Sequence, residues 1–507
     1  MNTPTAQPDH QNEDTHSARE TLRAGRLKKA TALREKGIDP YPHVYDRTHQ
    51  AGTLQDHYKD LENGTETTDV VRVAGRIMAM RNNGMFIDLH DPSGKIQVFC
   101  HKDSMDEDAL AALEYYDIGD VIGAEGTIRR TPRGELSVRA VKTAMLTKSL
   151  LPLPEKYHGL HDIETRYRQR YLDLIMNEES RETLRKRSVI MKEIRRFMDE
   201  EIGAVEVETP ILQAIMGGAS AKPFVTHHNA LDSDFYLRVA PELFLKRLIV
   251  GGFAEGVYEI GRLFRNEGIS IKHNPEFTTI EGYHLYKDYN DMMDLVERLV
   301  QSLVKKVTGG SLVMPFGDHE IDFSGPWKRK SMVDLVKDET GIDFMAITDV
   351  AEARKAAEKA GVSADPKANW GQVVEAVFGD KVEPKLIQPI HVTDHPLDIS
   401  PLAKTHRDNP RLVERFESFI NGWEIANAFT ELNDPLIQRE RFQAQVDARE
   451  AGDEEAQMMD DDFINALEYG LPPTGGWGMG LDRLVMILTD SHNIRDVICF
   501  PTLRPKG

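Results

Sequence analysis

The stretch VYEIGRLFRNEGISIKHNPEFTTIEGYHLY, residues 257–286, decides the fold of the second half of this chain. Residues 257–262 alternate in character, and residues 277–286 are rich in β-branched and aromatic side chains, so both ends are typical of strands. The middle, residues 266–275, is polar and rich in turn-forming residues. The pattern predicts an antiparallel hairpin with a long charged loop. Composition alone favours a solvated loop, with its charges facing water, equally well.

Three motifs in this chain resemble those of one enzyme family. The stretches F-R-N-E-G and H-N-P-E-F-T, within residues 264–278, resemble motif 2 of the class II aminoacyl-tRNA synthetases and are most similar to the lysyl-tRNA synthetase version. Residues 197–210 resemble motif 1, and residues 476–483 resemble motif 3. The likeness runs from about Val70 to the C-terminus. It implies an α+β fold, in which an antiparallel sheet is flanked by helices, and a homodimer formed through motif 1.

Composition excludes several classes of protein. Net charge is −20, from 63 basic and 83 acidic residues, which opposes indiscriminate binding to nucleic acid. Basic residues nevertheless cluster between Arg19 and Lys36. No apolar run approaches the roughly 20 residues of a membrane helix, and the N-terminus lacks the pattern of a signal peptide. Cys100 and Cys499 are the two cysteines, too few for a disulfide framework. We expect a cytoplasmic protein with no membrane segment.

The first 150 residues predict a small nucleic-acid-binding barrel. From about Val70 to Leu146, five short strands separated by turns enclose one helical piece, typical of an OB-fold Greek-key barrel. OB barrels bind single strands by stacking bases on aromatic side chains. The resemblance implies that this barrel reads the anticodon of tRNA(Lys), with Phe86 stacking a base and Gln97 and Glu135 reading base edges.

Four regions are expected along the chain. The N-terminal arm has no expected structure up to about residue 17, and a basic helix follows to Lys36. A Pro-rich linker connects the barrel to the catalytic domain. We assign no chemistry to residues 326–384, which read as mostly helical. The expected regions are residues 1–55 (arm and helix), 56–150 (barrel), 151–164 (linker) and 165–507 (catalytic domain).

The chemistry requires side chains that bind phosphate, because the chain lacks a phosphate loop and a dinucleotide-binding glycine motif. Guanidinium groups grip phosphate oxygens at two points. Arg265 lies in the charged loop, and Arg483 lies one turn into a helix preceded by three glycines. Alternatively, the glycines form an ordinary turn and Arg483 only makes a salt bridge, with no role in phosphate binding. The resemblance implies that both arginines are catalytic and that the ATP-binding residues are Arg265, Glu267, His273, Phe277 and Arg483.

A metal site is implied by the same resemblance. Mg²⁺ bridges phosphate oxygens and uses only one or two protein carboxylates. The family's metal-binding glutamates fall on Glu417 and Glu424. A spacing of seven residues puts them on opposite faces of one continuous strand. We therefore expect a bend or bulge between them at Gly422. Spacing alone favours two surface glutamates.

Specificity is expected in a strand near the C-terminus. Asn427, Phe429 and Glu431 alternate onto one of its faces. Together with other family positions they make an acidic pocket with aromatic walls, which suits L-lysine and its two amino groups. The implied lysine-binding residues are Glu242, Glu281, Tyr283, Asn427, Phe429 and Glu431.

The implied activity is ATP-dependent activation of L-lysine and its transfer to tRNA(Lys). An aspartyl- or asparaginyl-type synthetase is an alternative, opposed by Glu242 and Glu431, since an aspartate side chain needs basic partners. A non-catalytic RNA-binding paralogue is another, opposed by the presence of Arg265 and Arg483. A paralogue that lysylates a protein is expected to lack the barrel.

Overall fold

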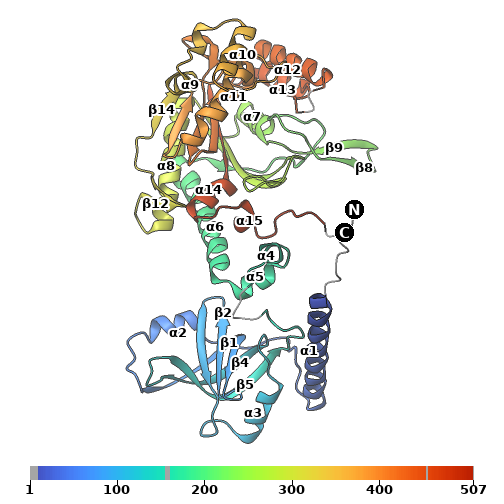
Figure 1. Cartoon of the computed structure of the whole chain (residues 1–507), viewed down its shortest axis with the longest axis vertical. Helices are drawn as coiled ribbons and strands as arrows, with labels where there is room; N and C mark the ends of the chain where they lie inside the picture. Colours follow the sequence, from blue (N-terminus) through green and yellow to red (C-terminus); the bar gives the residue numbers. More distant parts are fainter. Residues whose placement is uncertain (1–9, 155–159, 453–454, 506–507) are drawn as a thin grey trace, which may run out of the picture. The chain divides into compact units, whose positions relative to one another are not determined.

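The computed structural model describes residues 10–154, 160–452 and 455–505, with the side chains of residues 10–17 left out of the description. The chain divides into two compact units, Met1–Gly159 and Leu160–Gly507 (Figure 1). Residues 155–159 of the expected linker lie outside the described part. Among the described helices, none is both long and apolar enough to cross a membrane.

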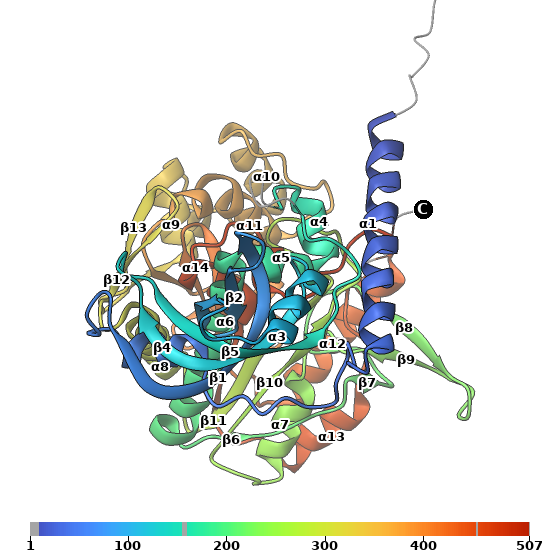
Figure 2. The same ribbon diagram turned by 90° about the horizontal axis from the view of Figure 1, so that it is seen from below.

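The first unit is a closed five-stranded barrel with a long helix beside it (Figure 2). Strand order is β1-β2-β3-β5-β4, as expected for an OB fold, and Ile87, Val98, Ile122 and Val138 fill its core. The helical piece is α3 followed by a 3₁₀ turn. The elements are α1 (His10–Glu35), α2 (Ala51–His57), β1 (Glu66–Arg81), β2 (Phe86–Asp91), β3 (Gly94–Phe99), α3 (Glu107–Ala111), β4 (Val121–Arg130) and β5 (Leu136–Thr147).

Helix α1 begins at His10, earlier than the sequence predicted. Neither Gly nor Pro interrupts residues 10–24, so the sequence there is compatible with an uninterrupted helix. The expectation for residues 1–9 lies outside the described residues. Within the unit, Arg26 anchors the helix by donating hydrogen bonds of 2.8–3.0 Å to three backbone oxygens, those of Ile118, Ser149 and Leu151.

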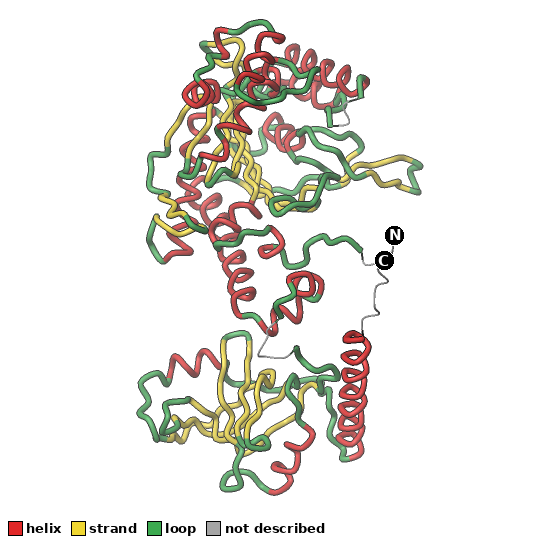
Figure 3. Tube along the Cα trace, viewed as in Figure 1, coloured by secondary structure: helices red, strands yellow, loops and turns green. Residues whose placement is uncertain are grey.

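The second unit is built on an eight-stranded sheet with helices packed around it (Figure 3). The six central strands pair antiparallel, as predicted, and each edge strand pairs parallel to its neighbour. In spatial order the strands are β14 (Lys328–Ser331), β15 (Ile390–Thr393), β18 (Arg415–Ile420), β19 (Trp423–Thr430), β20 (Thr474–Gly480), β11 (Glu276–Leu285), β10 (Gly256–Phe264) and β6 (Val205–Glu206).

Helices of this unit form three packed groups. One group, α6, α8 and α14, shares the main core with the sheet, and α9–α11, from residues 326–384, make a separate core against β15 and β18. The third, α7 and α13 with α12, covers Val257 and Tyr283. The helices are α4 (Ile163–Arg168), α5 (Arg170–Met176), α6 (Glu178–Arg196), α7 (Glu242–Val250), α8 (Tyr289–Thr308), α9 (Met332–Thr340), α10 (Val350–Lys359), α11 (Trp370–Lys381), α12 (Pro435–Glu450), α13 (Asp461–Gly470), α14 (Leu481–Leu488) and α15 (Ile494–Val497).

Small antiparallel sheets complete the unit. They pair β7 and β8 with β9, β12 with β13, and β16 with β17. Their strands are β7 (Leu212–Gln213), β8 (Val225–His228), β9 (Ser233–Leu237), β12 (Val313–Phe316), β13 (His319–Asp322), β16 (Thr405–His406) and β17 (Asn409–Val413).

The predicted hairpin is confirmed as β10 and β11. Val257 pairs with Tyr283 and Phe264 with Glu276, so the loop between the strands runs from Arg265 to Pro275. The loop closes through a 2.9 Å hydrogen bond from the Arg265 amide to the Pro275 carbonyl.

The bend expected at Gly422, between Glu417 and Glu424, is a complete reversal of the chain. The chain reverses at Asn421 and Gly422, whose φ values are 52° and 65°, and β18 and β19 pair antiparallel. Two successive left-handed residues make the tight turn that Asn-Gly favours in hairpins. The expected bulge does exist, but it lies at Ile425, where the pairing shifts register between Ser418 and Phe419.

Motif 1 forms the edge of the large sheet. Helix α6 continues through a π-helical turn, Phe197–Ile202, which ends at Gly203 in the left-handed conformation. Strand β6 then pairs with β10, and the Tyr258 hydroxyl donates to Asp199 over 2.7 Å. The edge leaves apolar side chains exposed at Val205, Ile211 and Leu212.

Candidate active site and nucleic-acid surface

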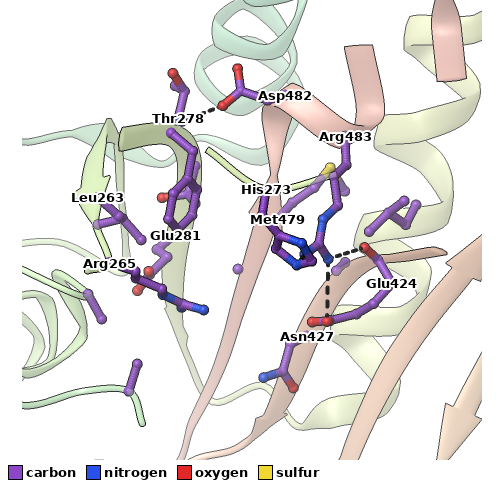
Figure 4. Close-up of a pocket in the computed structure, with 18 of the residues that line it drawn as sticks. Leu263, Arg265, His273, Thr278, Glu281, Glu424, Asn427, Met479, Asp482 and Arg483 are labelled. Carbon is purple, nitrogen blue, oxygen red and sulfur yellow. Dashed lines mark hydrogen bonds and ion pairs between the residues drawn. The ribbon is translucent and has the colours of Figure 1, made fainter. Parts of the chain in front are cut away.

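A cavity of about 250 Å³ lies over the middle of the large sheet. Strand alternation divides the residues there into two faces. On β11, Ile280 belongs to the main core, whereas its neighbours Thr279 and Glu281 line the cavity. Lining residues come from the β10–β11 loop, β11, β19, β20, α7 and α14, and Figure 4 shows how several of them converge. The lining includes Glu242, Arg265, Glu267, His273, Phe277, Glu281, Tyr283, Glu424, Asn427, Phe429 and Arg483.

Two residues expected at the site lie behind its wall. Glu417 is absent from the cavity lining, and its carboxylate accepts a 2.5 Å hydrogen bond from Arg415. Glu431 is also absent from the lining and is 1% exposed.

Glycines in β20 leave the floor of the cavity open. A Cβ at Gly476 would lie 1.8 Å from Oε1 of Glu431 and 2.6 Å from Cε1 of Tyr283, and one at Gly478 would lie 3.2 Å from Cγ of Glu281. Real Cβ atoms do not approach other atoms as closely as the first two distances require. These positions therefore need glycine to admit the carboxylate side chains.

Arg265 faces the cavity with free hydrogen-bonding capacity. Its guanidinium carbon lies 5.3 Å from the centre of the Phe277 ring, a cation–π arrangement. Its buried Nε has no hydrogen-bond partner among the described residues. A buried donor without a partner is costly, so this arginine is prepared for an anionic ligand.

Arg483 lies on another wall, held by groups from two other segments. Its Nη1 donates to the backbone oxygen of Glu424 over 3.0 Å, and its Nη2 lies 3.0 Å from Nε2 of His273. Since arginine can only donate, Nε2 must accept, and the neutral ring carries its proton on Nδ1, 2.8 Å from the Ser270 hydroxyl. Burial and the Arg483 charge lower the pKa of His273, which favours this neutral form.

Asp482 and Arg187 join the three motif segments, and the sequence did not single them out. The Asp482 carboxylate accepts a 2.6 Å hydrogen bond from the Thr278 amide of β11 and pairs with Arg187 of α6. Arg187 also donates to the Thr278 hydroxyl over 3.1 Å. The arginine and the aspartate are 295 residues apart, so no local pattern could have linked them.

The far end of the cavity is acidic. Glu242, Glu281 and Tyr283 line it, and Glu431 lies behind. Burial and the neighbouring charge of Glu242 raise the pKa of Glu281 to about 8, and burial raises the pKa of Glu431 to about 8. A bound cation would lower both pKa values by favouring the ionised forms. The sequence reasoning missed Lys246, whose ammonium lies between Glu242 and Glu431.

The carboxylates expected to bind metal lie on the β18–β19 hairpin. Glu424 lines the cavity, and the charge of Glu417, together with burial, raises its pKa. Within the described residues, no group of three or more His, Cys, Asp or Glu side chains could hold a metal by itself. Glu424 at the cavity, with Glu417 on the neighbouring strand, fits a Mg²⁺ ion that takes its remaining ligands from a substrate.

One outer face of the barrel gathers the residues expected to meet RNA. Phe86 pairs with Phe99 across β2 and β3, their ring centres 5.2 Å apart, and the Phe99 ring stacks on His101. Arg129 lies over Phe99 at 4.8 Å. The sequence reasoning missed Phe99 and His101, although Phe99 lies at the alternating position that shares a face with Gln97.

Gln97 and Glu135 lie on the same side of the barrel. Gln97 is 9% exposed, and its Oε1 accepts a 2.9 Å hydrogen bond from the Ser137 hydroxyl, which leaves its amide nitrogen as a donor. Glu135 lies 3.9 Å from the Lys95 ammonium.

The catalytic unit and the barrel together define a class II aminoacyl-tRNA synthetase. The model of the family described as "tRNA synthetases class II (D, K and N)" matches residues 162–504, and that of the "OB-fold nucleic acid binding domain" matches residues 71–143. Both matches agree with the large antiparallel sheet and the closed barrel.

Curated relatives narrow this class to one specificity. The chain is 55% identical over 497 residues to a lysine–tRNA ligase of Gloeobacter violaceus, covering 97% of this chain and 99% of the relative. It is 54% identical over 482 residues to one of Sinorhizobium medicae (95% and 96%) and 52% identical over 483 residues to one of Carboxydothermus hydrogenoformans (95% and 97%). The chain belongs to the lysine–tRNA ligase family. It activates lysine with ATP and charges tRNA, and the aspartyl or asparaginyl alternative is not favoured.

Replacing Gly476 by alanine should weaken lysine binding. The new Cβ would displace the Glu431 and Tyr283 side chains. Losing one hydrogen bond to a charged group costs about 1.5–3 kcal/mol, so the Michaelis constant for lysine in ATP–pyrophosphate exchange should rise about 10–100-fold. In the control Gly379→Ala, in α11, the nearest atom would be 4.0 Å away, and exchange should be unchanged. If Gly476→Ala leaves the Michaelis constant for lysine unchanged, the lysine pocket does not lie beside Gly476.

Proposed function

We propose that the two arginines of the cavity stabilise the charge that develops as lysine attacks ATP. Arg265 bridges the lysine carboxylate and the α-phosphate, and Arg483 holds the phosphates from the other wall. The observation that carries this assignment is the unpartnered Nε of Arg265, buried beside the cavity and next to the Phe277 ring. Preorganised cations in a site shielded from water stabilise such charge without reorganisation.

The adenosine is held by the β10–β11 loop and the strand after it. Phe277 stacks on the adenine, Glu267 accepts a hydrogen bond from its amino group, and His273 contacts the outer phosphates. This assignment is supported by the presence of all three side chains in the cavity lining beside the two arginines. The neutral His273 ring donates its Nδ1 proton to the Ser270 hydroxyl in a hydrogen bond and directs its Nε2 lone pair towards Arg483.

Lysine occupies the acidic end. Glu281 holds the α-ammonium, Glu242 and Glu431 hold the ε-ammonium with Tyr283, and Phe429 lies along the aliphatic stem. Asn427 completes the wall, its side-chain oxygen fixed by a 3.0 Å hydrogen bond from Arg415. An acidic end opposite two arginines matches an amino acid with two ammonium groups and one carboxylate.

The reaction requires little acid–base catalysis, because the attacking carboxylate is already an anion. Positioning and charge stabilisation supply the rate enhancement. Glu424 and Glu417 would hold Mg²⁺, which when bound neutralises charge on the phosphates. Burial raises the pKa of Glu424 and the charge of Glu417 raises it further, so a bound cation would favour its ionised form.

The outer face of the barrel reads the anticodon of tRNA(Lys). Phe86 stacks on a base, and Gln97 and Glu135 contact base edges. The support is a continuous aromatic surface of Phe86 and Phe99 beside one free amide donor and one carboxylate.

The enzyme acts as a homodimer in the cytoplasm. The exposed apolar side chains along the motif 1 edge, Val205, Ile211 and Leu212, favour a covering partner, and a second copy is the partner that the family resemblance implies. Both cysteines are free, as suits a reducing compartment.

Arg265→Ala should slow adenylate formation about 10²–10³-fold, because one donor to the developing charge is lost. Lysine affinity, measured by equilibrium dialysis, should change much less. Single-turnover adenylate formation is the decisive measurement, and wild-type speed in the variant would refute the role. Arg262→Ala is the matched control, since Arg262 lies three residues earlier, on β10, outside the cavity lining, and its side chain is half exposed.

Phe86→Ala should weaken tRNA charging at least about tenfold, since one stacked base contributes about 1–3 kcal/mol. Lysine-dependent exchange without tRNA should be unchanged. Phe86→Leu keeps an apolar side chain without the flat ring, so it should be impaired like the alanine variant. If leucine restores charging, Phe86 is a packing residue of the barrel instead.

Sedimentation equilibrium should give a particle of about twice the 57.3 kDa chain mass. Ile211→Lys places a charge in the proposed interface and should shift the particle towards the monomer. Val313→Lys, on β12, is a control at an apolar position of similar exposure and should stay dimeric. A monomeric wild-type enzyme at micromolar concentration would rule out the dimer.

A further inference from the structure

A lysine of the enzyme itself lies at the acidic end of the cavity. Lys246 is one turn after Glu242 on α7 and is 0% exposed. Its ammonium donates a 2.6 Å hydrogen bond to Oε1 of Glu242 and forms an ion pair with Glu431. It does not line the cavity, so it approaches the two carboxylates from behind.

Aromatic rings enclose the rest of this ammonium. Its nitrogen lies 5.8 Å from the centre of the Tyr283 ring, 5.5 Å from that of Phe429 and 5.9 Å from that of Phe463. Two of these rings, Tyr283 and Phe429, also line the cavity. Lys246 therefore contacts both carboxylates and two of the side chains assigned to lysine.

Glu431 depends on this contact more than Glu242 does. Apart from the ion pair with Lys246, neither of its buried carboxylate oxygens has a polar partner among the described residues. A buried carboxylate without hydrogen bonds is strongly disfavoured unless a cation lies close or a ligand supplies donors.

The balance of charge between the carboxylates and the substrate indicates a role for Lys246. Glu242, Glu281 and Glu431 bring three negative charges to one end of the cavity, whereas a lysine substrate brings two ammonium groups. Lys246 cancels one charge from behind, which leaves two for the substrate. Without it, ionising all three carboxylates in one buried region would cost more, because like charges raise each other's pKa.

We propose that Lys246 is a positioning residue for lysine selection: its ammonium fixes Glu242 and Glu431 and neutralises one of them, so that the pocket accepts a single side-chain ammonium. The inference rests on the proposed assignment of Glu242 and Glu431 to the ε-ammonium. Lys246 does not touch the substrate and acts through the two carboxylates.

The pKa directions agree with this arrangement. Burial raises the pKa values of Glu242 and Glu431, and Lys246 lowers both. The other charged or titratable groups that act on these two carboxylates are Glu281, Arg415 and, through its hydroxyl, Tyr283. Removing Lys246 should therefore raise the carboxylate pKa values further. Since an ammonium binds the ionised form, lysine binding should then require a higher pH.

The test compares Lys246→Met with wild type in lysine-dependent ATP–pyrophosphate exchange. The Michaelis constant for lysine should rise at least about tenfold near neutral pH and recover as pH rises towards about 9, because the carboxylates ionise. The constant for ATP should change little, and rejection of norleucine should weaken about tenfold. Lys246→Arg, which keeps the charge, should preserve the wild-type pH profile.

Two further variants keep the test decisive. Lys246→Met with Glu431→Gln removes one charge of each sign, so it should recover lysine binding relative to Lys246→Met and remain measurable if the single variant fails to fold. Arg247→Met is the control, because Arg247 follows Lys246 on α7 but pairs with Asp460 over 2.7 Å, away from these carboxylates.

The outcomes separate the inference from the function on which it rests. If Glu431→Gln keeps the wild-type lysine constant and norleucine rejection, the assignment of Glu431 fails. If Glu431→Gln is impaired but Lys246→Met keeps the wild-type lysine constant and pH profile, only the role of Lys246 is overturned. The role of Lys246 is also overturned if the double variant binds lysine no better than Lys246→Met and the Michaelis constant of Lys246→Met for lysine does not recover at high pH.

Discussion

The carboxylate of Asp482 fixes the geometry on which the site depends. It is 2% exposed, accepts from the Thr278 amide and pairs with Arg187, so α6, β11 and α14 meet at one buried group. Phe277 precedes Thr278 and Arg483 follows Asp482, so the bonds that lock the backbone also orient Phe277, the proposed adenine platform, and one arginine of the cavity. An enzyme that works by positioning loses rate when such groups shift by about 1 Å, which explains why so costly a buried charge is kept.

Opposite charges are separated along the cavity, and each end is stabilised differently. The arginine end keeps capacity for an anion. Among the described residues Nε of Arg265 has no hydrogen-bond partner. Arg483 is held by the backbone oxygen of Glu424 and by neutral His273, with one carboxylate oxygen of Glu424 3.6 Å from its Nη1. The acidic end is partly balanced in advance by Lys246. Each end of the cavity therefore retains a charge that a substrate can complement. Lysyl adenylate would match both ends, with its phosphate towards the arginines and its ammonium groups towards the carboxylates.

Local patterns predicted the elements better than the site. The β10–β11 hairpin and the barrel follow from strand alternation and turn residues, and the structure has them. The bend at Gly422 was predicted, because Glu417 and Glu424 could not share a face of one continuous strand. Its form, the tight β18–β19 hairpin, was not predicted, although Asn421-Gly422 is itself a hairpin signal. Lys246 and Asp482 could not be assigned from sequence, because their partners come from distant segments. Glu242 and Lys246, at i and i+4 on α7, were the available clue.

A net charge of −20 and a polyanionic substrate are compatible because charge acts locally. At physiological ionic strength, interactions between exposed charges fade over about 8 Å, so a bound RNA strand senses the side chains beneath it rather than the total. On the barrel these are the Phe86 and Phe99 rings with Arg129 above them. Stacking supplies an attraction that salt does not screen, and the surrounding negative charge disfavours nucleic acids that offer no unstacked base. The acidic surface thereby contributes to selectivity for a tRNA with an exposed anticodon loop.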